Sequence, residues 1–241
     1  MKKLRILLLS FYYTPDFCAG SFRSQSISDA LLKEERIRHF YVFTTYPHRY
    51  GPLNNIQNIK NNPKCIIIKC KVPQHKNRFF RQLITFFVFA FKSFFLSVKH
   101  KNDFDLILIT SSRFGTAFLG YILSLFLKKP LAIDIRDIFS DSLNSLDGSY
   151  SFLLKFFSKI IKKIETLIIK HAKWKNFVSP GFLEYYDSID FKEHNPNIFT
   201  NGIDNIFIKN RKFFNINHVN SPNTPINILY AGNIGYGQGL E

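Results

Sequence analysis

The sequence contains few cysteines and few acidic residues. Its three cysteines, Cys18, Cys65 and Cys70, are odd in number and lack the spacing of metal ligands, which argues against a disulfide framework and against a zinc site. Asp and Glu total 17 against 33 Lys and Arg, so the formal net charge is +16. Most basic residues are lysines, whose point charge suits a diffuse anionic surface better than base recognition. We therefore expect an anionic membrane surface or a phosphorylated substrate as partner, with nucleic acid as the weaker alternative.

Long apolar runs are also missing. No stretch reaches the about 18 uninterrupted apolar residues of a membrane span, and the nearest, Leu83–Val98, carries Lys92. The apolar stretch Leu4–Leu9 is short and leads into a Pro-Asp turn without a small-residue cleavage site. We interpret it as a first core strand instead of a secretory signal, and we expect a cytoplasmic protein.

Short apolar segments alternate with longer segments of helical periodicity. This alternation predicts βαβ units, and hence an α/β fold with a Rossmann-like parallel sheet and helices on both faces. Ligands of such sheets bind at the carboxyl ends of the strands, so we expect chemistry in the loops Tyr13–Gly20, Ser111–Gly115 and Asp134–Asp141. The predicted strands are Leu4–Leu9, Phe40–Thr44, Cys65–Cys70, Leu106–Thr110, Leu131–Ile135, Asn176–Ser179 and Asn197–Thr200, and the predicted helices are Ser21–Glu35, Phe79–Lys99, Thr116–Phe126 and Phe152–His171.

The composition changes after residue 204. Residues 205–225 are rich in Asn and Lys and contain two prolines, which is typical of a linker. Residues 226–241 then read as a strand, INILYAG, and a glycine-rich turn. A strand and a turn have no partner layer on which to bury apolar side chains. We therefore predict a Rossmann-like domain over 1–204 and the truncated start of a second domain over 226–241.

Two of the predicted helices are amphipathic in unusual ways. In Phe152–His171 and just beyond it, six lysines fall within an arc of roughly 100°. They are Lys155, Lys159, Lys162, Lys163, Lys170 and Lys173. This stripe is either a solvated face or a contact to anionic headgroups. The helix Phe79–Lys99 carries phenylalanine over most of its circumference, and these rings either fill the core or dip into a bilayer interface.

The loop after the first predicted strand lacks the G-x-G-x-x-G dinucleotide fingerprint. Gly20 still permits close approach of another group, because it has no side chain. We expect Ser21 to cap the following helix, with Arg23 in its first turn. A helix amino terminus carries positive partial charge and free N–H groups, so these three residues suit a diphosphate. An ordinary strand-to-helix turn is the alternative.

Two carboxylates, Asp134 and Asp137, flank Arg136 at the end of a predicted strand. Catalytic groups of parallel sheets lie at such ends. One carboxylate is a candidate to accept a proton from a sugar hydroxyl. An Asp–Arg ion pair that only holds the loop is the alternative.

Five motifs follow one another along the chain, namely YYTPDFCAGSFR, DIRDIFSDS, FVSPGF, TNGID and LYAGNIGYGQGLE. In this order they resemble the bacterial family-4 glycosyltransferases of the GT-B fold, close to those that build O-antigen and capsule repeat units. The resemblance implies two Rossmann-like domains with a cleft between them. It also implies retaining transfer of a sugar from a nucleotide-sugar to a polyprenyl-linked or polysaccharide acceptor, without metal or cofactor, at the inner face of the cytoplasmic membrane.

The resemblance also implies roles for single residues. Gly20 would approach the donor diphosphate, and Asp134 or Asp137 would lie near the acceptor. The donor-side turn would contribute Gly232, Asn233 and Gln238. Many members carry Arg and Lys at the last two of these positions, and the family's E-x7-E pair, which grips the donor, is absent from this sequence. We therefore expect little transfer by this chain alone, with a separate chain supplying the donor domain, or else a non-catalytic membrane-binding module.

Overall fold

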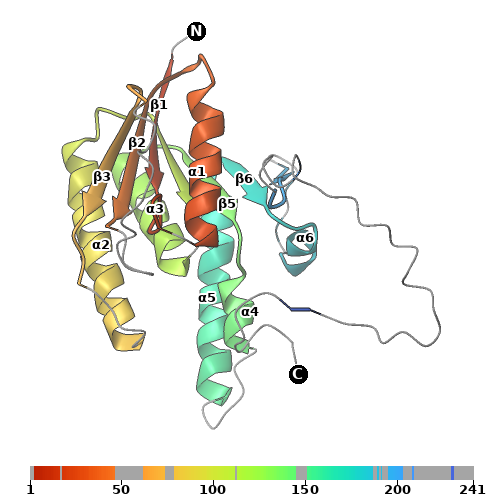
Figure 1. Cartoon of the computed structure of the whole chain (residues 1–241). Coiled ribbons are helices and arrows are strands. Elements are labelled where there is room, and N and C mark those ends of the chain that lie inside the picture. Colours follow the sequence, from red (N-terminus) through yellow and green to blue (C-terminus); the bar gives the residue numbers. More distant parts are fainter. Residues whose placement is uncertain are drawn as a thin grey trace.

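The computed structural model of the chain describes residues 3–16, 18–46, 62–73, 79–111, 113–144, 151–186, 189, 191, 195–202, 208 and 229–230. The elements are shown in Figure 1. The strands are β1 (Leu4–Leu9), β2 (Ile37–Thr45), β3 (Cys65–Cys70), β4 (Leu106–Thr110), β5 (Leu131–Ile135), β6 (Trp174–Phe177) and β7 (Asn197–Ile198). The helices are α1 (Ala19–Leu32), α2 (Phe79–Lys99), α3 (Phe114–Leu127), α4 (Phe139–Asn144), α5 (Ser151–His171) and α6 (Gly181–Tyr185).

The seven strands form one sheet in the order β3-β2-β1-β4-β5-β6-β7, and every neighbouring pair is parallel. This confirms the predicted α/β class. Because all strands run the same way, the loops that follow them gather at one edge of the sheet. The order of the strands reverses between β1 and β4, so this edge has its topological switch point there, where sheets of this kind bind ligands.

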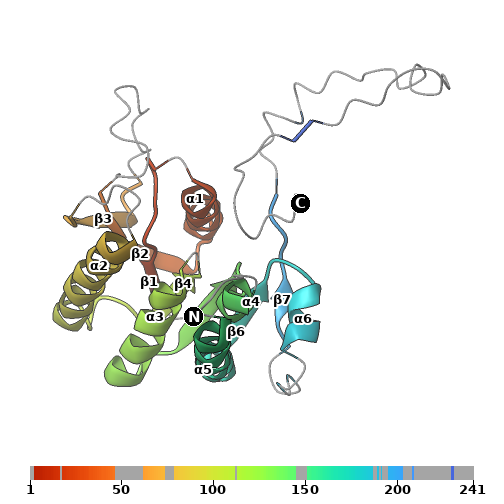
Figure 2. The same cartoon turned by 90° about the horizontal axis from the view of Figure 1, so that it is seen from below.

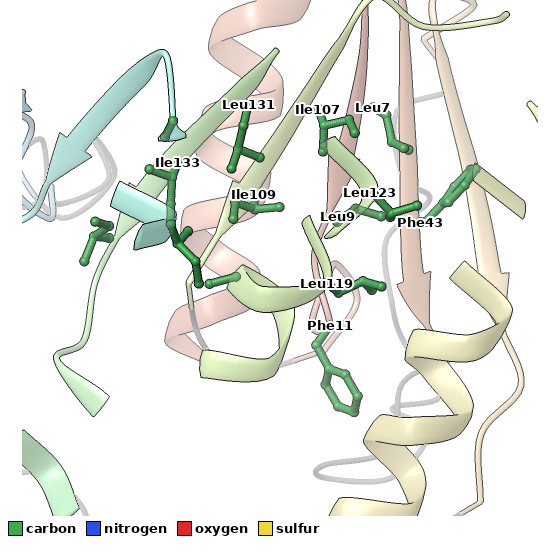
Figure 3. Close-up of a cluster of buried hydrophobic side chains, with 14 of the residues drawn as sticks. Leu7, Leu9, Phe11, Phe43, Ile107, Ile109, Leu119, Leu123, Leu131 and Ile133 are labelled. Atoms are coloured by element: carbon green, nitrogen blue, oxygen red, sulfur yellow. The ribbon is translucent and has the colours of Figure 1, made fainter. Parts of the chain in front are cut away.

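Helices cover both faces of the sheet. Figure 2 shows α1 on one face and α2, α3 and α5 on the other. The strands are short apolar runs, as expected for a parallel sheet that is buried on both sides. The larger core lies under α2, α3 and α5, and Figure 3 shows part of it. There Leu7, Leu9, Ile107 and Ile109 of the sheet pack against α3. The smaller core, with Leu8 and Phe40, lies under α1.

The predicted bounds of β1, β3, α2, β4 and β5 are confirmed, and the short helices α4 and α6 were missed. One prediction about α1 is wrong. The helix begins at Ala19 with Cys18 as N-cap and has no side-chain cap, so Ser21 does not cap it and Arg23 lies beyond its first turn. Ser21 is instead buried against the sheet. Of the predicted linker, strand and glycine-rich turn over 205–241, only residues 208, 229 and 230 are among the described residues.

Candidate active site

Small side chains bring α1 close to the sheet. Its buried face is formed by Gly20, Ser21, Ser24 and Ser28. The Ser24 hydroxyl donates to the Gly20 carbonyl at 2.9 Å and also contacts the hydroxyls of Ser10 and Thr110, at 2.7 and 3.2 Å. These bonds tie the start of α1 to the carboxyl ends of β1 and β4. Gly20 and Ser21 therefore face the sheet, and the first turn of α1 lies at the switch point.

Arg23 and Asp134 form a two-pronged ion pair across this edge. The Arg23 Nε donates to Asp134 Oδ2 at 2.9 Å, and Nη2 donates to Oδ1 at 2.7 Å. Asn176 on β6 donates to the same Oδ1 at 2.6 Å. The two side chains are only 12% and 5% exposed. The Asp–Arg pairing that the sequence left open thus exists, but its arginine is Arg23 and not the neighbouring Arg136.

The remaining donors of Arg23 bind the chain after β7. Nη2 donates to the Phe199 carbonyl at 2.9 Å, and Nη1 donates to the Thr200 carbonyl at 3.0 Å and to Asn201 Oδ1 at 3.4 Å. All five guanidinium N–H groups therefore have acceptors within the chain. In this arrangement Arg23 has no donor left for a diphosphate. Asp134 is likewise a structural acceptor and not a free base.

Asp137 has the opposite surroundings. It is exposed and accepts no hydrogen bond from the described residues. Neighbouring protein atoms shield the carboxylate from water, and this desolvation raises the pKa of Asp137. The positive charge of Arg136 only partly opposes the rise. A raised pKa brings a carboxylate nearer to the range in which a general base works well at neutral pH. Of the two candidate aspartates, Asp137 is thus the one that is able to meet a substrate.

An apolar hollow opens beside Asp137. It lies between α3 and α5 at the carboxyl edge of the sheet, is partly open to solvent, and has a cavity volume of about 20 Å³, enough for a water molecule. Ser111, Phe114, Asp137 and Phe139 line it, and Glu165 and several aliphatic side chains complete its wall. Ser111 Oγ also accepts the Arg136 backbone N–H at 3.0 Å, which holds the loops after β4 and β5 together. The hollow therefore joins one exposed carboxylate to an apolar surface.

Glu165 on α5 holds the start of α4 in place beside the hollow through two hydrogen bonds. Its Oε1 accepts the Phe139 backbone N–H at 3.0 Å, and its Oε2 accepts the Ser140 hydroxyl at 2.5 Å. It thus provides acceptors for the first turn of α4, as a capping residue would. Burial raises the pKa of Glu165, while these hydrogen bonds lower it. The net effect is a rise, which has a measurable consequence for stability.

We expect acid to stabilise the native chain relative to a Glu165→Gln variant. Because the folded pKa of Glu165 lies above its ordinary value of 4.5, the folded state binds more protons than the unfolded state as the pH falls through this range. The gain begins near the folded pKa and is complete below the unfolded pKa. Urea unfolding of both chains between neutral and mildly acidic pH measures the difference. A difference that does not change with pH would contradict the assigned direction.

Arg113 is the cation at the switch point. Its guanidinium lies over the rings of Phe11 and Tyr12, at 4.4 and 5.2 Å from their centroids, and Nη2 donates to the Tyr12 hydroxyl at 2.5 Å. The predicted loop Ser111–Gly115 contains it, yet nothing in the local sequence distinguishes Arg113 from other loop residues. The sequence likewise does not reveal the contacts made by Arg136, Glu165 and Asn176, because each partner lies on a distant segment. Of the candidate donor residues, Gly232, Asn233 and Gln238 lie outside the described residues.

No family model and no curated protein matches the sequence. Solved structures match it at low identity. A sucrose-phosphate synthase from Thermosynechococcus elongatus aligns with a TM-score of 0.54 and 14% identity, over 85% of this chain and 94% of that one. HepE from Anabaena in complex with UDP and glucose aligns with 0.51 and 13%, over 83% of this chain and 45% of that one. A UGT transferase from Siraitia grosvenorii in complex with UDP aligns with 0.50 and 10%, over 82% and 51%.

The described part of the chain thus has the Rossmann-like α/β fold found in these glycosyltransferase structures. At these identities the likeness establishes the architecture and not a substrate, because one fold hosts many reactions. This chain spans about half the length of the HepE and UGT chains. The resemblance stated from the five sequence motifs is therefore confirmed for the glycosyltransferase fold, while membership of family 4 stays a prediction.

Proposed function

We propose that the chain is the acceptor-side part of a retaining glycosyltransferase related to family 4. It takes a sugar from a nucleotide-sugar and places it on a polyprenyl-linked or polysaccharide acceptor, such as an O-antigen or capsule unit, at the inner face of the cytoplasmic membrane. The observation that carries this proposal is the free, exposed Asp137 beside an apolar hollow at the carboxyl edge of the sheet. The fold adds support, since two of its solved neighbours contain UDP.

Asp137 acts as the general base in this proposal. Its carboxylate accepts the proton of an acceptor hydroxyl while the hydroxyl oxygen bonds to the anomeric carbon of the donor. The bond from that carbon to the diphosphate breaks, and the nucleoside diphosphate leaves with the electron pair. Retention requires that the new bond forms on the face from which the diphosphate departs. The hollow beside Asp137 excludes water from one side of the acceptor, which favours transfer over hydrolysis.

The donor diphosphate needs positive charge or N–H groups close to it. Arg113 stands at the switch point and is the cation that the described residues offer there. Arg23 is occupied by Asp134, and Gly20 and Ser21 are buried against the sheet. We therefore propose that most donor contacts come from residues 226–241, so that the chain alone transfers sugar slowly.

Transfer is tested with labelled nucleotide-sugars. UDP-glucose, UDP-N-acetylglucosamine and GDP-mannose, each labelled in the sugar, are incubated with the purified chain and vesicles of a bacterial lipid extract. We expect slow movement of label into the organic phase, above that of heat-denatured protein. The anomeric configuration of the product, read by NMR, tests retention. A folded chain that moves no label from any donor would contradict the proposal.

A non-catalytic module is the second candidate. One observation favours it: the Arg23–Asp134 pair removes both charged groups from the edge at which a reaction would occur. Under this alternative the chain binds lipid vesicles in the same preparation but transfers no label. The two readouts therefore separate the candidates.

A further inference from the structure

The helix α2 buries several small polar residues and exposes a row of large apolar ones. The side chains that face the sheet and are fully buried include Thr85, Ser93 and Ser97, with Phe89 between them. The outer side presents a ridge of large apolar side chains at helical spacing. We call this the phenylalanine ridge, and its members are Phe80, Ile84, Phe87, Phe91 and Phe95, with exposures of 55–78%.

This pattern is the reverse of that expected for a surface helix in water. Such a helix turns its apolar stripe to the core and its polar residues to solvent. Here the buried hydroxyls find acceptors inside the chain, since Thr85 donates to the Pro73 carbonyl at 2.9 Å and Ser97 to the Ser93 carbonyl at 2.7 Å. The inner face is completed by Phe89, which is fully buried, and by Phe86 and Phe94, which pack against the core, so the exposed ring side chains are additional to those that the core uses. By length and composition, residues 80–99 would even suffice to cross a membrane, but the helix packs on β2, β3 and α3.

The ridge continues onto α3. The ring of Phe94 lies 5.3 Å from that of Phe126, whose side chain is 62% exposed, and Leu125 beside it is 47% exposed. Figure 2 shows α2, α3 and α5 side by side in one layer on this face. The apolar surface thus spans at least two helices. Contiguous apolar surface on this scale marks an interaction site.

The exposed charges on the three helices of this face are of one sign. Neither α2 nor α3 contains an acidic residue, and the one carboxylate of α5, Glu165, is buried. Exposed cations flank the ridge on α2 at Arg81 and Lys99. The outer side of α5 adds Lys155, Lys159, Lys163 and Lys170. An apolar ridge bordered by cations is complementary to an anionic bilayer surface, where rings enter the interfacial region and lysines meet headgroups.

We propose that the outer face of α2, together with the adjoining end of α3, docks onto an anionic lipid bilayer. The phenylalanine ridge inserts at the interface, and the exposed lysines of α5 lie against headgroups. A second copy of this chain is a poorer occupant, because two chains that each carry a formal net charge of +16 repel one another. The amino-terminal end of α2 lies near the carboxyl edge of the sheet (Figure 1). The docked chain thus holds its candidate active site beside the membrane, although the docking itself does not depend on catalysis.

Vesicle sedimentation tests the surface. The purified chain is mixed with phosphatidylcholine vesicles with and without phosphatidylglycerol, at low and high salt. We expect binding to the anionic vesicles that weakens with salt. The double variant Phe87→Ser/Phe91→Ser is expected to partition at least about tenfold less, since each ring loses its apolar burial. The control Phe22→Ser removes a phenylalanine that is 56% exposed, against 67% and 66% for Phe87 and Phe91, from α1 on the opposite face and is expected to bind like the native chain.

A single substitution reports insertion directly. In Phe91→Trp, the indole is expected to shift its fluorescence to the blue on anionic vesicles and to be quenched by brominated lipid, a readout that does not depend on the serine variants. Three results would overturn the proposal. They are native-like binding by the double serine variant, an unquenched indole, or a dimer without vesicles that the serine variant converts to a monomer, which would assign the ridge to self-association.

Discussion

Replacing Arg23 with alanine is expected to lower the free energy of unfolding by about 3–5 kcal/mol. The change removes the only cation paired with Asp134 among the described residues, and this carboxylate is only 5% exposed in the native chain. A buried carboxylate without a compensating charge is destabilising, because its lost hydration is no longer replaced by an ion pair. Asn176 still donates to Oδ1 but carries no charge. The three contacts to the chain after β7 are lost as well.

Urea unfolding of Arg23→Ala and of a matched surface variant measures this effect. Arg36→Ala breaks a pair with Glu34 whose atoms are 3.8 Å apart and whose side chains are 73% and 55% exposed. For that variant we expect a change of at most about 1 kcal/mol. Adding Asp134→Asn to Arg23→Ala should recover part of the loss, since the unpaired charge is then gone. Equal losses in the two arginine variants would show that the Arg23–Asp134 pair contributes no more than a surface pair.

Much of the fold was predictable because its strands carry a local signal. Leu4–Leu9, Cys65–Cys70 and Leu131–Ile135 are short, β-branched or leucine-rich runs bounded by polar residues, and only the interior of a sheet accommodates them in series. The short helices gave a weaker signal. The helix α4 depends on the distant Glu165 for its first-turn acceptors, so its own residues predict it poorly.

Which side of a helix is buried was less predictable from the sequence. The phenylalanines of α2 admitted either a core or a bilayer interpretation, because periodicity identifies a stripe but not its neighbour. Only the packing shows that the buried stripe consists of Thr85, Phe89, Ser93 and Ser97, while other phenylalanines are exposed. The prediction of the site residues was limited in the same way. Asp134 and Asp137 look alike in sequence, and their roles separate only when Arg23, distant by 111 residues, reaches one of them.

Replacing Asp137 with asparagine is expected to reduce sugar transfer by about 10²–10⁴-fold, the usual contribution of a general base. The amide keeps the size of the carboxylate but cannot accept the proton of the acceptor hydroxyl. In the native chain the raised pKa of Asp137 makes transfer fall, as the pH drops, at a higher pH than an ordinary aspartate would give. The measurement is transfer of label into lipid as a function of pH, for the native chain and the variant.

Stability distinguishes loss of a base from loss of structure. Because its environment raises the pKa of Asp137, the folded chain disfavours the ionised carboxylate, and the neutral asparagine should leave the free energy of unfolding unchanged or slightly higher at neutral pH. Asp29→Asn is the matched control, since Asp29 is exposed on α1 and its Oδ1 accepts only a local bond from Gln25 at 2.8 Å. That control should retain both activity and stability. If Asp137→Asn transfers sugar as fast as the control does, Asp137 is not the base.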